Sequence, residues 1–272
     1  MRTAYSFFFS PTGTTRRVAA ALAQALDMPT VGTDLTCAAV PATEIGADDL
    51  AVLAAPVYGG RIPPLALERM AAVRGNGTPA VIVVVYGNRA FEGAARELAA
   101  WARSHGFRPV AAAAFVGEHS YSTPATPIAV GRPDSDDLAA AAAFGARIRE
   151  KLRSGDLREV AVKRLKTPHT PLLPLLRFIG SVVPLMWKMR AAKEAAVPFV
   201  EADACTRCGR CAAHCPTQAI ARGDCLHTDP TRCIRCCACV KGCPAGARRY
   251  DTPFSALLAR DFARRKPPVT LL

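Results

Sequence analysis

Apolar residues fall into short runs along the first part of the chain, and segments with helical spacing lie between them. Turn residues bound the apolar runs, which predicts buried strands at 3–9, 50–58, 79–86 and 109–116. Apolar residues recur at helical spacing in 16–26, 91–105 and 136–153. Strands that alternate with helices form a parallel sheet with helices on both faces. The pattern therefore predicts an α/β fold with a doubly wound parallel sheet of five strands.

This alternation of predicted strands and helices ends near residue 160. Residues 161–198 have basic ends around an apolar middle, and Pro174, Arg177 and Pro184 lie within that middle. These three residues argue against a helix that crosses a membrane. Two interpretations stay open: a strap that packs on both domains, which we favour, or a segment that binds a membrane surface or a partner. We expect a first domain at 1–160, a connector at 161–198 and a second domain at 199–272.

Cysteine is concentrated in the second domain. Residues 205–216 read CTRCGRCAAHCP and residues 233–244 read CIRCCACVKGCP, so each fits C-x2-C-x2-C-x3-C-P. This spacing is typical of bacterial proteins with two [4Fe–4S] clusters, in which the fourth cysteine of one run binds the cluster of the other. We expect one cluster to be bound by Cys205, Cys208, Cys211 and Cys243. We expect the second to be bound by Cys233, Cys236, Cys239 and Cys215.

The two runs are an internal repeat. A shift of 28 residues superimposes the four cysteines of each run and also pairs three further residues, Pro216 with Pro244, Arg207 with Arg235, and Ala219 with Ala247. A zinc site fits less well, because one tetrahedral ion needs four ligands and the runs supply twice that number. A disulfide framework belongs to secreted chains. We expect Cys37 and Cys225, which fall outside the pattern, to be small apolar residues.

A hydroxyl-rich turn follows the first predicted strand. Residues 10–15 read SPTGTT and lead directly into a predicted helix. Backbone N–H groups at a helix N-terminus bind phosphate, and a glycine there allows close approach. The hydroxyls that can donate to a phosphate beside Gly13 are those of Ser10, Thr12, Thr14 and Thr15. A capped helix start is the alternative interpretation of the turn alone.

Two later loops favour a flavin. In a doubly wound sheet the loops after neighbouring strands gather at the carboxyl edge, where ligands bind. The loops after the second and third runs supply Pro56, Val57, Tyr58 and Gly59, then Gly87, Asn88, Arg89 and Phe91. With the turn at 10–15, this pattern resembles flavodoxins over roughly the first 155 residues.

The resemblance implies a flavodoxin-like fold that binds flavin mononucleotide (FMN), with these loops around the isoalloxazine ring. Tyr58 is the candidate for one face of the ring, and either Phe91 or an open face for the other. Asn88 and Arg89 replace acidic residues of many flavodoxins, and an arginine beside the ring would favour the anionic reduced form. Arg89 as a solvated surface charge is the alternative. His119 and Tyr121, in the loop at 117–127, contact either the ligand or only the loop itself.

The whole chain except the connector resembles the fused flavodoxin–ferredoxin proteins of anaerobic bacteria and archaea. That resemblance implies a second small α+β ferredoxin-like iron–sulfur domain and electron transfer between the clusters and FMN. The carrier function, between a ferredoxin-type donor and a partner redox enzyme, is favoured. The alternative is a flavin-dependent reductase that acts on a small unsaturated, quinone-like or nitro substrate. No nucleotide-binding GxGxxG pattern stands out for a nicotinamide donor.

Charge divides the chain unevenly. Residues 1–160 carry 16 basic and 15 acidic side chains, whereas residues 161–272 carry 19 and 7. A basic half favours an acidic partner, and an acidic ferredoxin-type protein fits the chemistry. The basic residues that we expect at its docking face are Arg235, Lys241, Arg248 and Arg249. Nucleic acid is ranked last, because no nucleic-acid motif accompanies the charge, and a membrane surface is the less favoured contact. Cluster cysteines and the absence of a signal-peptide pattern predict a cytoplasmic location.

Overall fold

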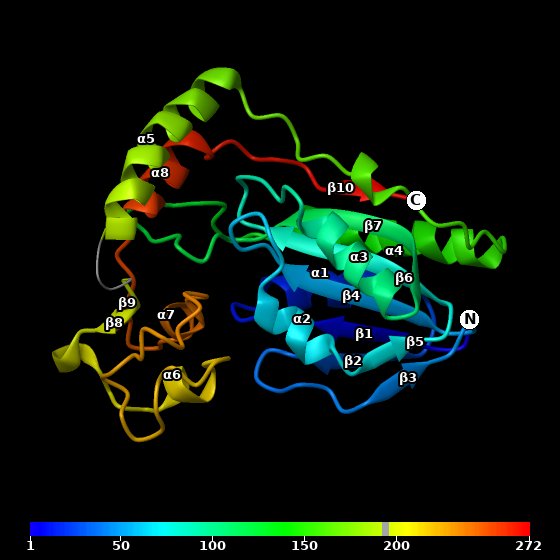
Figure 1. Ribbon diagram of the computed structural model, residues 1–272, viewed down its shortest axis with the longest axis horizontal. Coiled ribbons are helices and arrows are strands. Elements are labelled where there is room, and N and C mark those ends of the chain that lie inside the picture. The colour runs from blue at the N-terminus through cyan, green and yellow to red at the C-terminus, as the bar shows by residue number, and fades with distance from the viewer. Residues whose placement is uncertain (192–195) are drawn as a thin grey trace. The chain divides into compact units, whose positions relative to one another are not determined.

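The computed structural model describes residues 1–191 and 196–272, so part of the predicted connector lies outside the described residues. The chain divides into two compact units, and Figure 1 shows the elements of each. The first unit comprises residues 1–118, 131–168 and 265–272, and the second comprises 119–130 and 169–264. The chain therefore passes between the units more often than the predicted order of two consecutive domains requires.

The first unit is built on a six-stranded sheet in the order β10-β7-β6-β4-β1-β2. Five of these strands are parallel: β1 (Ala4–Phe8), β2 (Thr30–Asp34), β4 (Leu50–Pro56), β6 (Thr78–Tyr86) and β7 (Phe107–Val116). Their order is that of the flavodoxin-like doubly wound fold, whose topological switch point lies between β1 and the next strand inward, here β4. The predicted fold class is confirmed.

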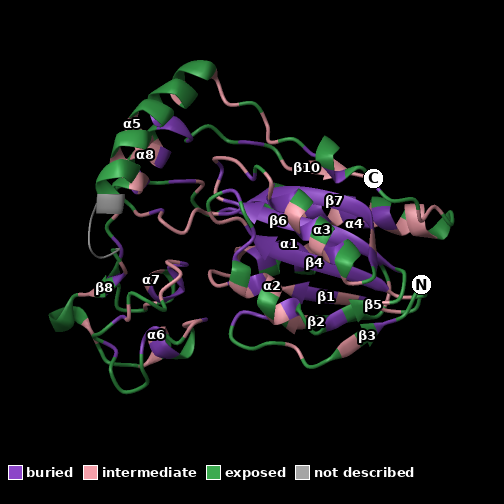
Figure 2. Cartoon of the chain, in the orientation of Figure 1, coloured by how far each residue is buried: buried purple, intermediate pink, exposed green. Residues whose placement is uncertain are grey.

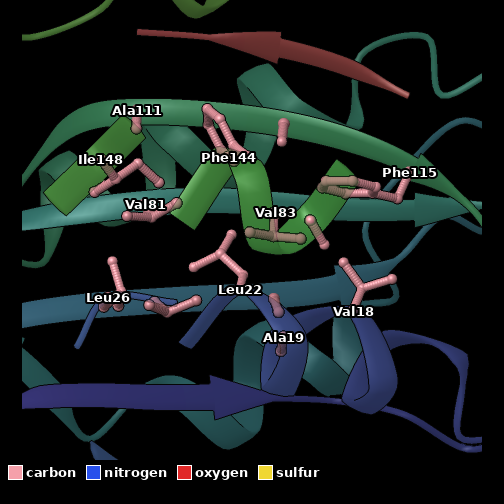
Figure 3. Packing of buried hydrophobic residues seen from close by; sticks show 14 of the residues in the cluster. Val18, Ala19, Leu22, Leu26, Val81, Val83, Ala111, Phe115, Phe144 and Ile148 are labelled. Atoms are coloured by element: carbon pink, nitrogen blue, oxygen red, sulfur yellow. The ribbon is translucent and has the colours of Figure 1, made fainter. Parts of the chain in front are cut away.

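Helices cover both faces of this sheet. The helices are α1 (Thr14–Gln24), α2 (Pro64–Met70), α3 (Ala94–Ser104) and α4 (Ser135–Arg153). Alternate residues of the buried strands, such as Val81 and Val83, form one core cluster with Val18 and Leu22 of α1 and Phe144 of α4. Figure 3 shows these side chains meeting between the helices and the strands. The central strands are buried on both faces, which explains why they are almost continuously apolar.

Four strands of the first unit, in three places, were not identified from the sequence. The edge strand β2 is largely exposed, so it lacks an apolar pattern. A separate two-stranded parallel sheet joins β3 (Thr43–Ile45) and β5 (Val73–Gly75). The fourth strand is β10 (Val269–Leu271), which pairs antiparallel with β7 and was predicted to belong to the second domain. The C-terminal residues cover an otherwise open sheet edge, which is the physical reason for this correction.

The second unit contains two packed helices and the cysteine repeat. Helix α5 (Leu172–Ala191) lies beside α8 (Pro253–Asp261) (Figure 1). The remaining elements of this unit are short: α6 (Arg210–Ala213), α7 (Ala238–Lys241), β8 (Phe199–Val200), β9 (Arg248–Arg249) and a 3-10 turn at Ala202–Ala204. A second 3-10 turn, at Val162–Arg164, belongs to the first unit. The loop 119–130 also belongs here, because Ile128 packs with Phe178, Leu258 and Phe262.

Helix α5 forms much of the predicted connector. Pro184, one of the residues that argue against a membrane-spanning helix, lies inside α5 and does not end it. Within the described part of the chain, the stretch Leu172–Met189 is long and apolar enough to cross a membrane on length and composition alone, and only 6% of it is buried. Figure 2 shows α5 mostly as exposed, in contrast to the buried strands of the sheet.

Candidate functional site

The eight cysteines of the two runs line two cavities in the second unit. Cavity I is lined by Cys205, Cys208, Cys211 and Cys243. Cavity II is lined by Cys215, Cys233, Cys236 and Cys239. Each cavity encloses about 310 Å³ of atom-free space, part of it open to solvent. The fourth cysteine of each run thus lies with the other run's first three, which is the grouping expected from the spacing.

The backbone repeats along with the cysteines. Helices α6 and α7 start 28 residues apart in the numbering, at Arg210 and Ala238. Positive φ angles recur at the same offset, at Arg207 and Arg235 (54° and 55°), Gly209 and Cys237 (74° and 59°), and Gln218 and Gly246 (53° and 61°). Left-handed conformations are uncommon outside glycine. Their recurrence at three paired positions therefore shows that the two runs fold in the same way.

The cavities suit a large anionic cluster better than a single ion. Among the described residues, no group of three or more His, Cys, Asp or Glu side chains is close enough to bind one metal ion. A tetrahedral zinc site would need four sulfurs about 2.3 Å from a common centre. Burial raises the pKa of Cys236 and of Cys239 to about 12, so these thiols need a metal to become thiolates at neutral pH. The donor set fits iron–sulfur ligation.

The residues around the cysteines differ between the cavities. Cavity I is lined by Thr206, Arg210 and Arg248, whereas the residues of cavity II at the same repeat positions are Ile234, Ala238 and Ile220. Exposure differs as well, because Cys208 of cavity I is exposed while Cys236 and Cys239 of cavity II are buried. Cavity I is the cationic member of the pair, with two arginines, whereas the polar side chains that line cavity II besides its cysteines are those of Thr217 and Thr228.

Arg248 is the most unusual residue of cavity I. Only 3% of it is exposed, and it donates from Nη1 to Thr228 Oγ1 over 2.6 Å and from Nη2 to the carbonyl of Cys225. Its buried Nε has no hydrogen-bond partner among the described residues. Burial raises the pKa of Cys211, and the Arg248 guanidinium beside it acts in the opposite direction. An orphaned donor on a cationic side chain beside a ligand thiol fits an anionic cluster in this cavity.

The other donors to cavity I are neutral. The backbone N–H of Arg210 and the hydroxyl of Thr206 lower the pKa of Cys208. Cavity II has the equivalent backbone donor, the N–H of Ala238 to Cys236, but Ile234 stands where the hydroxyl would be. Both cavities thus share this backbone hydrogen bond. Their side-chain hydroxyls lie at different places, because Thr206 is beside Cys208 in cavity I whereas Thr217 Oγ1 is 3.7 Å from Cys215 Sγ in cavity II.

Two of the remaining cysteines lie closer to the cavities than expected. Cys225 was placed outside the pattern, yet it is buried and lines cavity I. Cys237 is buried and lines cavity II. Cys37 is exposed in the first unit. Cys225 lies there because its carbonyl accepts a hydrogen bond from Arg248, a contact that only the folded chain reveals.

The four basic residues that were expected at a docking face make hydrogen bonds or an ion pair within the second unit. Arg248 is buried. Lys241 Nζ donates to the carbonyl of Ser122 over 2.7 Å, and Arg235 Nε donates to the carbonyl of Ala196 over 2.9 Å. Arg249 forms an ion pair with Glu201 at 2.8 Å. The burial of Arg248 makes its predicted place on a docking face wrong, and the other three side chains have structural roles.

The turn at 10–15 joins β1 to α1 at the carboxyl edge of the sheet. Gly13 precedes α1 in the left-handed region (φ 83°) and has no side chain that could cap the helix. Ser10 Oγ accepts from the backbone N–H of Arg16, in the first turn of α1, over 3.0 Å, which fixes the turn. Thr15 is buried, and its Oγ1 has no hydrogen-bond partner among the described residues. A helix N-terminus with an orphaned hydroxyl fits an anion such as the FMN phosphate.

The loops after β4 and β6 lie at the same edge as this turn, because β1, β4 and β6 are neighbouring parallel strands. The half-buried Tyr58 forms an isolated antiparallel β-bridge with Arg61. Gly60 has a positive φ, and a Cβ atom at this position would collide with the side chain of Glu92. Asn88 is buried with φ 65°, and Arg89 pairs with Glu92 at 2.6 Å. The structure therefore brings the three predicted loops together.

Two aromatic candidates differ from expectation. Phe91 is only 1% exposed and packs edge-on against Tyr86 with ring centroids 5.4 Å apart, so it is a core residue instead of a cover for the flavin ring. Tyr121 packs against Tyr250 at 5.2 Å, and both belong to the second unit. His119 lies in the same unit, next to Tyr121. These two residues have a structural role in the loop 119–130, as the second of the two interpretations states.

Residues 198–221 and 226–249 match the family model of the 4Fe-4S binding domain. The second unit carries a tandem 4Fe-4S binding motif. The matched stretches contain all eight cysteines that line the cavities. No curated protein matches the chain.

Solved structures of flavodoxins are similar to the first part of the chain. An archaeal flavodoxin is 15% identical with a TM-score of 0.39, and the match covers 56% of this chain and 99% of that one. A flavodoxin of Streptococcus pneumoniae TIGR4 is 19% identical with a TM-score of 0.37, over 56% and 99%. Rubredoxin oxygen:oxidoreductase of Desulfovibrio gigas is 11% identical with a TM-score of 0.36, over 57% of this chain and 37% of its own.

Proposed function

We propose that this protein transfers single electrons between two [4Fe–4S] clusters and FMN, and that it links a ferredoxin-type donor to a partner redox enzyme. The observation that carries the proposal is the pair of cavities, each lined by four cysteines that come from both runs. When bound, iron–sulfur clusters supply one-electron transfer and a flavin supplies one- or two-electron chemistry.

The side chains of the chain have distinct tasks in this proposal. The eight cysteines hold the clusters, and Arg248 and Thr206 stabilise negative charge at cavity I. The N-terminus of α1, with Thr12, Gly13 and Thr14 beside it, binds the phosphate of FMN. The loops after β4 and β6 hold the isoalloxazine ring. We propose Tyr58 as the aromatic residue that contacts it.

An acidic donor would dock at exposed basic residues of the second unit. Since the four charges expected from the sequence have other roles, the candidates are Arg207 and Arg222, which are both exposed. Charge complementarity raises the encounter rate and makes it fall with salt. The variant Arg207→Glu/Arg222→Glu should slow flavin reduction by reduced ferredoxin and flatten its salt dependence, while reduction by a chemical reductant is unchanged. An unchanged ferredoxin-driven rate would mean that the donor docks elsewhere.

Cofactor content is the first experiment. Anaerobic reconstitution should give about eight iron atoms and about eight inorganic sulfides per chain, together with about one FMN. Zinc without sulfide would refute the cluster assignment. In Thr12→Ala and Gly13→Val the flavin content should fall while the iron content is unchanged, because only the phosphate turn is altered. Unchanged flavin retention in both variants would mean that the turn only begins a helix.

Turnover separates the carrier from a reductase. A carrier passes electrons to a second protein and leaves small quinone-like, nitro or unsaturated compounds unreduced. Steady reduction of such a compound by the reconstituted protein with reduced ferredoxin would favour the reductase. The partner enzyme and a cytoplasmic location belong to this proposal, since thiols that bind clusters persist where the compartment is reducing.

A further inference from the structure

Exposed apolar side chains are concentrated on one helix. In the described part of the chain, fourteen large hydrophobic side chains are exposed, and nine of them lie on α5. Trp187 is 73% exposed and Leu173 is 76% exposed. Single exposed apolar residues are ordinary, but a contiguous group marks an interaction surface.

The exposed residues of α5 form a stripe. Leu172, Leu176, Ile179, Val183 and Trp187 follow one another at spacings of three or four residues, which places them on one face of a helix. Leu175 and Met186 flank this stripe. No polar side chain interrupts it from Leu172 to Trp187, so it forms a continuous apolar face along most of the helix.

The opposite face of α5 is fixed to the second unit. Phe178 packs edge-on against Phe262, with ring centroids 4.9 Å apart, and belongs to the same buried cluster as Leu258 of α8. Arg177 Nε donates to Oδ1 of the buried Asp261 over 2.6 Å. Arg260 donates to Ser181 Oγ over 3.1 Å. The apolar stripe is therefore the outer face of a helix that is held in place from behind.

This attachment argues against a helix that spans a bilayer. A spanning α5 would carry the Arg177–Asp261 pair and the neighbouring Arg260 into hydrocarbon, where charged groups are costly. A helix that lies along the surface buries only its apolar stripe and leaves the ion pair on the protein side. The geometry favours the second arrangement.

The charges around α5 complement an anionic surface. Residues 169–193, which belong to the second unit, contain four basic residues and no acidic one. Lys188 directly follows Trp187, and Arg190 lies near the end of the same helix. Tryptophan with adjacent basic residues is typical of the level of lipid headgroups. A protein groove would accept the apolar stripe, but a long segment without any acidic residue fits a surface of uniform negative charge.

We propose that α5 is an interfacial helix that binds the protein to the surface of a membrane containing anionic phospholipids. Its apolar stripe would enter the headgroup region, and basic residues near the C-terminal end of the helix, among them the exposed Lys188, would contact lipid phosphates. This inference goes beyond the proposed electron transfer, and it concerns where in the cell the transfer takes place. It does not depend on which cofactors are bound.

Vesicle co-sedimentation of the reconstituted protein tests the proposal. Vesicles of phosphatidylcholine alone are compared with vesicles in which about a third of the lipid is phosphatidylglycerol. We expect binding to the anionic vesicles that falls as salt is raised. Leu176→Gln/Val183→Gln should weaken that binding roughly tenfold or more, because the stripe loses apolar area. Val31→Gln/Val130→Gln is the matched control, since both valines lie outside α5 and are 49% and 62% exposed.

Charge reversal separates the two contributions. Lys188→Glu should weaken binding to anionic vesicles by roughly fivefold or more, whereas Arg222→Glu, an exposed residue of the same unit, should not. Iron and flavin contents of every variant report whether the fold is intact. No binding to either vesicle would overturn the proposal, and so would equal loss in the stripe variant and its control. Purification of a protein partner that needs the stripe, without vesicle binding, would also overturn it.

Discussion

The two cysteine runs have the same spacing and the same backbone conformation, yet the cavities that they line differ in chemistry. Cavity I contains a buried arginine, an exposed arginine and a threonine, where cavity II contains isoleucine, alanine and isoleucine. Cavity II also holds the more deeply buried cysteines. The spacing of the cysteines therefore determines which sulfurs line the same cavity, while the other lining residues determine the chemical environment of those sulfurs.

This difference has an electrostatic consequence. Reduction adds one negative charge to a cluster, and a neighbouring cation or hydrogen-bond donor stabilises that charge, whereas apolar burial opposes it. Arg248 and Thr206 line cavity I, whereas no arginine lines cavity II, whose hydroxyls are those of Thr217 and Thr228. The cluster in cavity I should have the higher reduction potential. An electron shared by the two clusters should reside mostly at cavity I.

The largest expected effect is the loss of a whole cluster, which tests how the cysteines of the two runs are grouped. Cys215→Ala should remove the cluster of cavity II, although Cys215 belongs to the first run, and Cys243→Ala should remove the cluster of cavity I. Each variant should keep about half of the iron. Redox titration followed by electron paramagnetic resonance should find the higher potential in Cys215→Ala and the lower one in Cys243→Ala. The reverse assignment would show that each run binds its own cluster.

Removal of the buried cation is the next test. Arg248→Leu should lower the potential of the cavity I cluster by about 60–130 mV, because a hydrogen bond to a charged group contributes about 1.5–3 kcal/mol and one electron corresponds to 59 mV per 1.4 kcal/mol. The potential of the cavity II cluster should shift by less, because Arg248 lines only cavity I, although its charge also opposes the raised pKa of Cys239. Arg249→Leu is the matched control, since Arg249 is adjacent in sequence but points to Glu201 at the surface.

A folding defect can be recognised separately. Arg248→Leu leaves Thr228 Oγ1 and the Cys225 carbonyl without their donor, so the variant can lose iron. Arg248→Lys keeps the charge and removes the fork of donors. It should lower the potential by less than Arg248→Leu does. Equal potentials in Arg248→Lys, Arg248→Leu and the unchanged protein, with full iron content, would contradict a tuning role.

The sequence predicted what depends on local pattern. Spacing was sufficient to group the cysteines, and the apolar runs located β1, β4, β6 and β7 within a few residues. The strand β2 was not predicted, because an exposed edge strand has no alternation of apolar and polar residues. Phe91 was placed at the flavin because it follows a ligand-side strand, but its packing on Tyr86 depends on a partner that the sequence pattern does not specify.

The features that were missed depend on long-range contacts. The C-terminal strand β10 pairs with β7 across more than half of the chain, and no local signal indicates this. Arg248 was interpreted as a surface charge, since arginines are seldom fully buried. A signal was nevertheless present: the 28-residue shift aligns Arg248 with Ile220, and an isoleucine at the equivalent position indicates a buried site. Comparison of non-cysteine positions in the repeat would have found it.

The smallest effect comes from a reciprocal exchange of neutral residues. Thr206 and Ile234 occupy equivalent positions, and the Thr206 hydroxyl is directed at Cys208 while Ile234 offers no donor. Thr206→Ile should lower the potential of the cavity I cluster by about 20–60 mV, the equivalent of a neutral hydrogen bond of about 0.5–1.5 kcal/mol. Ile234→Thr should raise the potential of the cavity II cluster by a similar or smaller amount.

The doubly exchanged protein makes this test stringent. Thr206→Ile/Ile234→Thr should narrow the gap between the two potentials by the sum of the two shifts, because the changed residues lie in different cavities and distant sites are additive. The gap should remain open, since Arg248 is untouched and its charge is the larger effect. Closure of the gap in this protein would mean that the hydroxyl, and not the buried guanidinium, distinguishes the cavities. A gap that does not change would mean that neither hydroxyl affects its cluster, which leaves Arg248 and the burial of the cysteines as the sources of the difference.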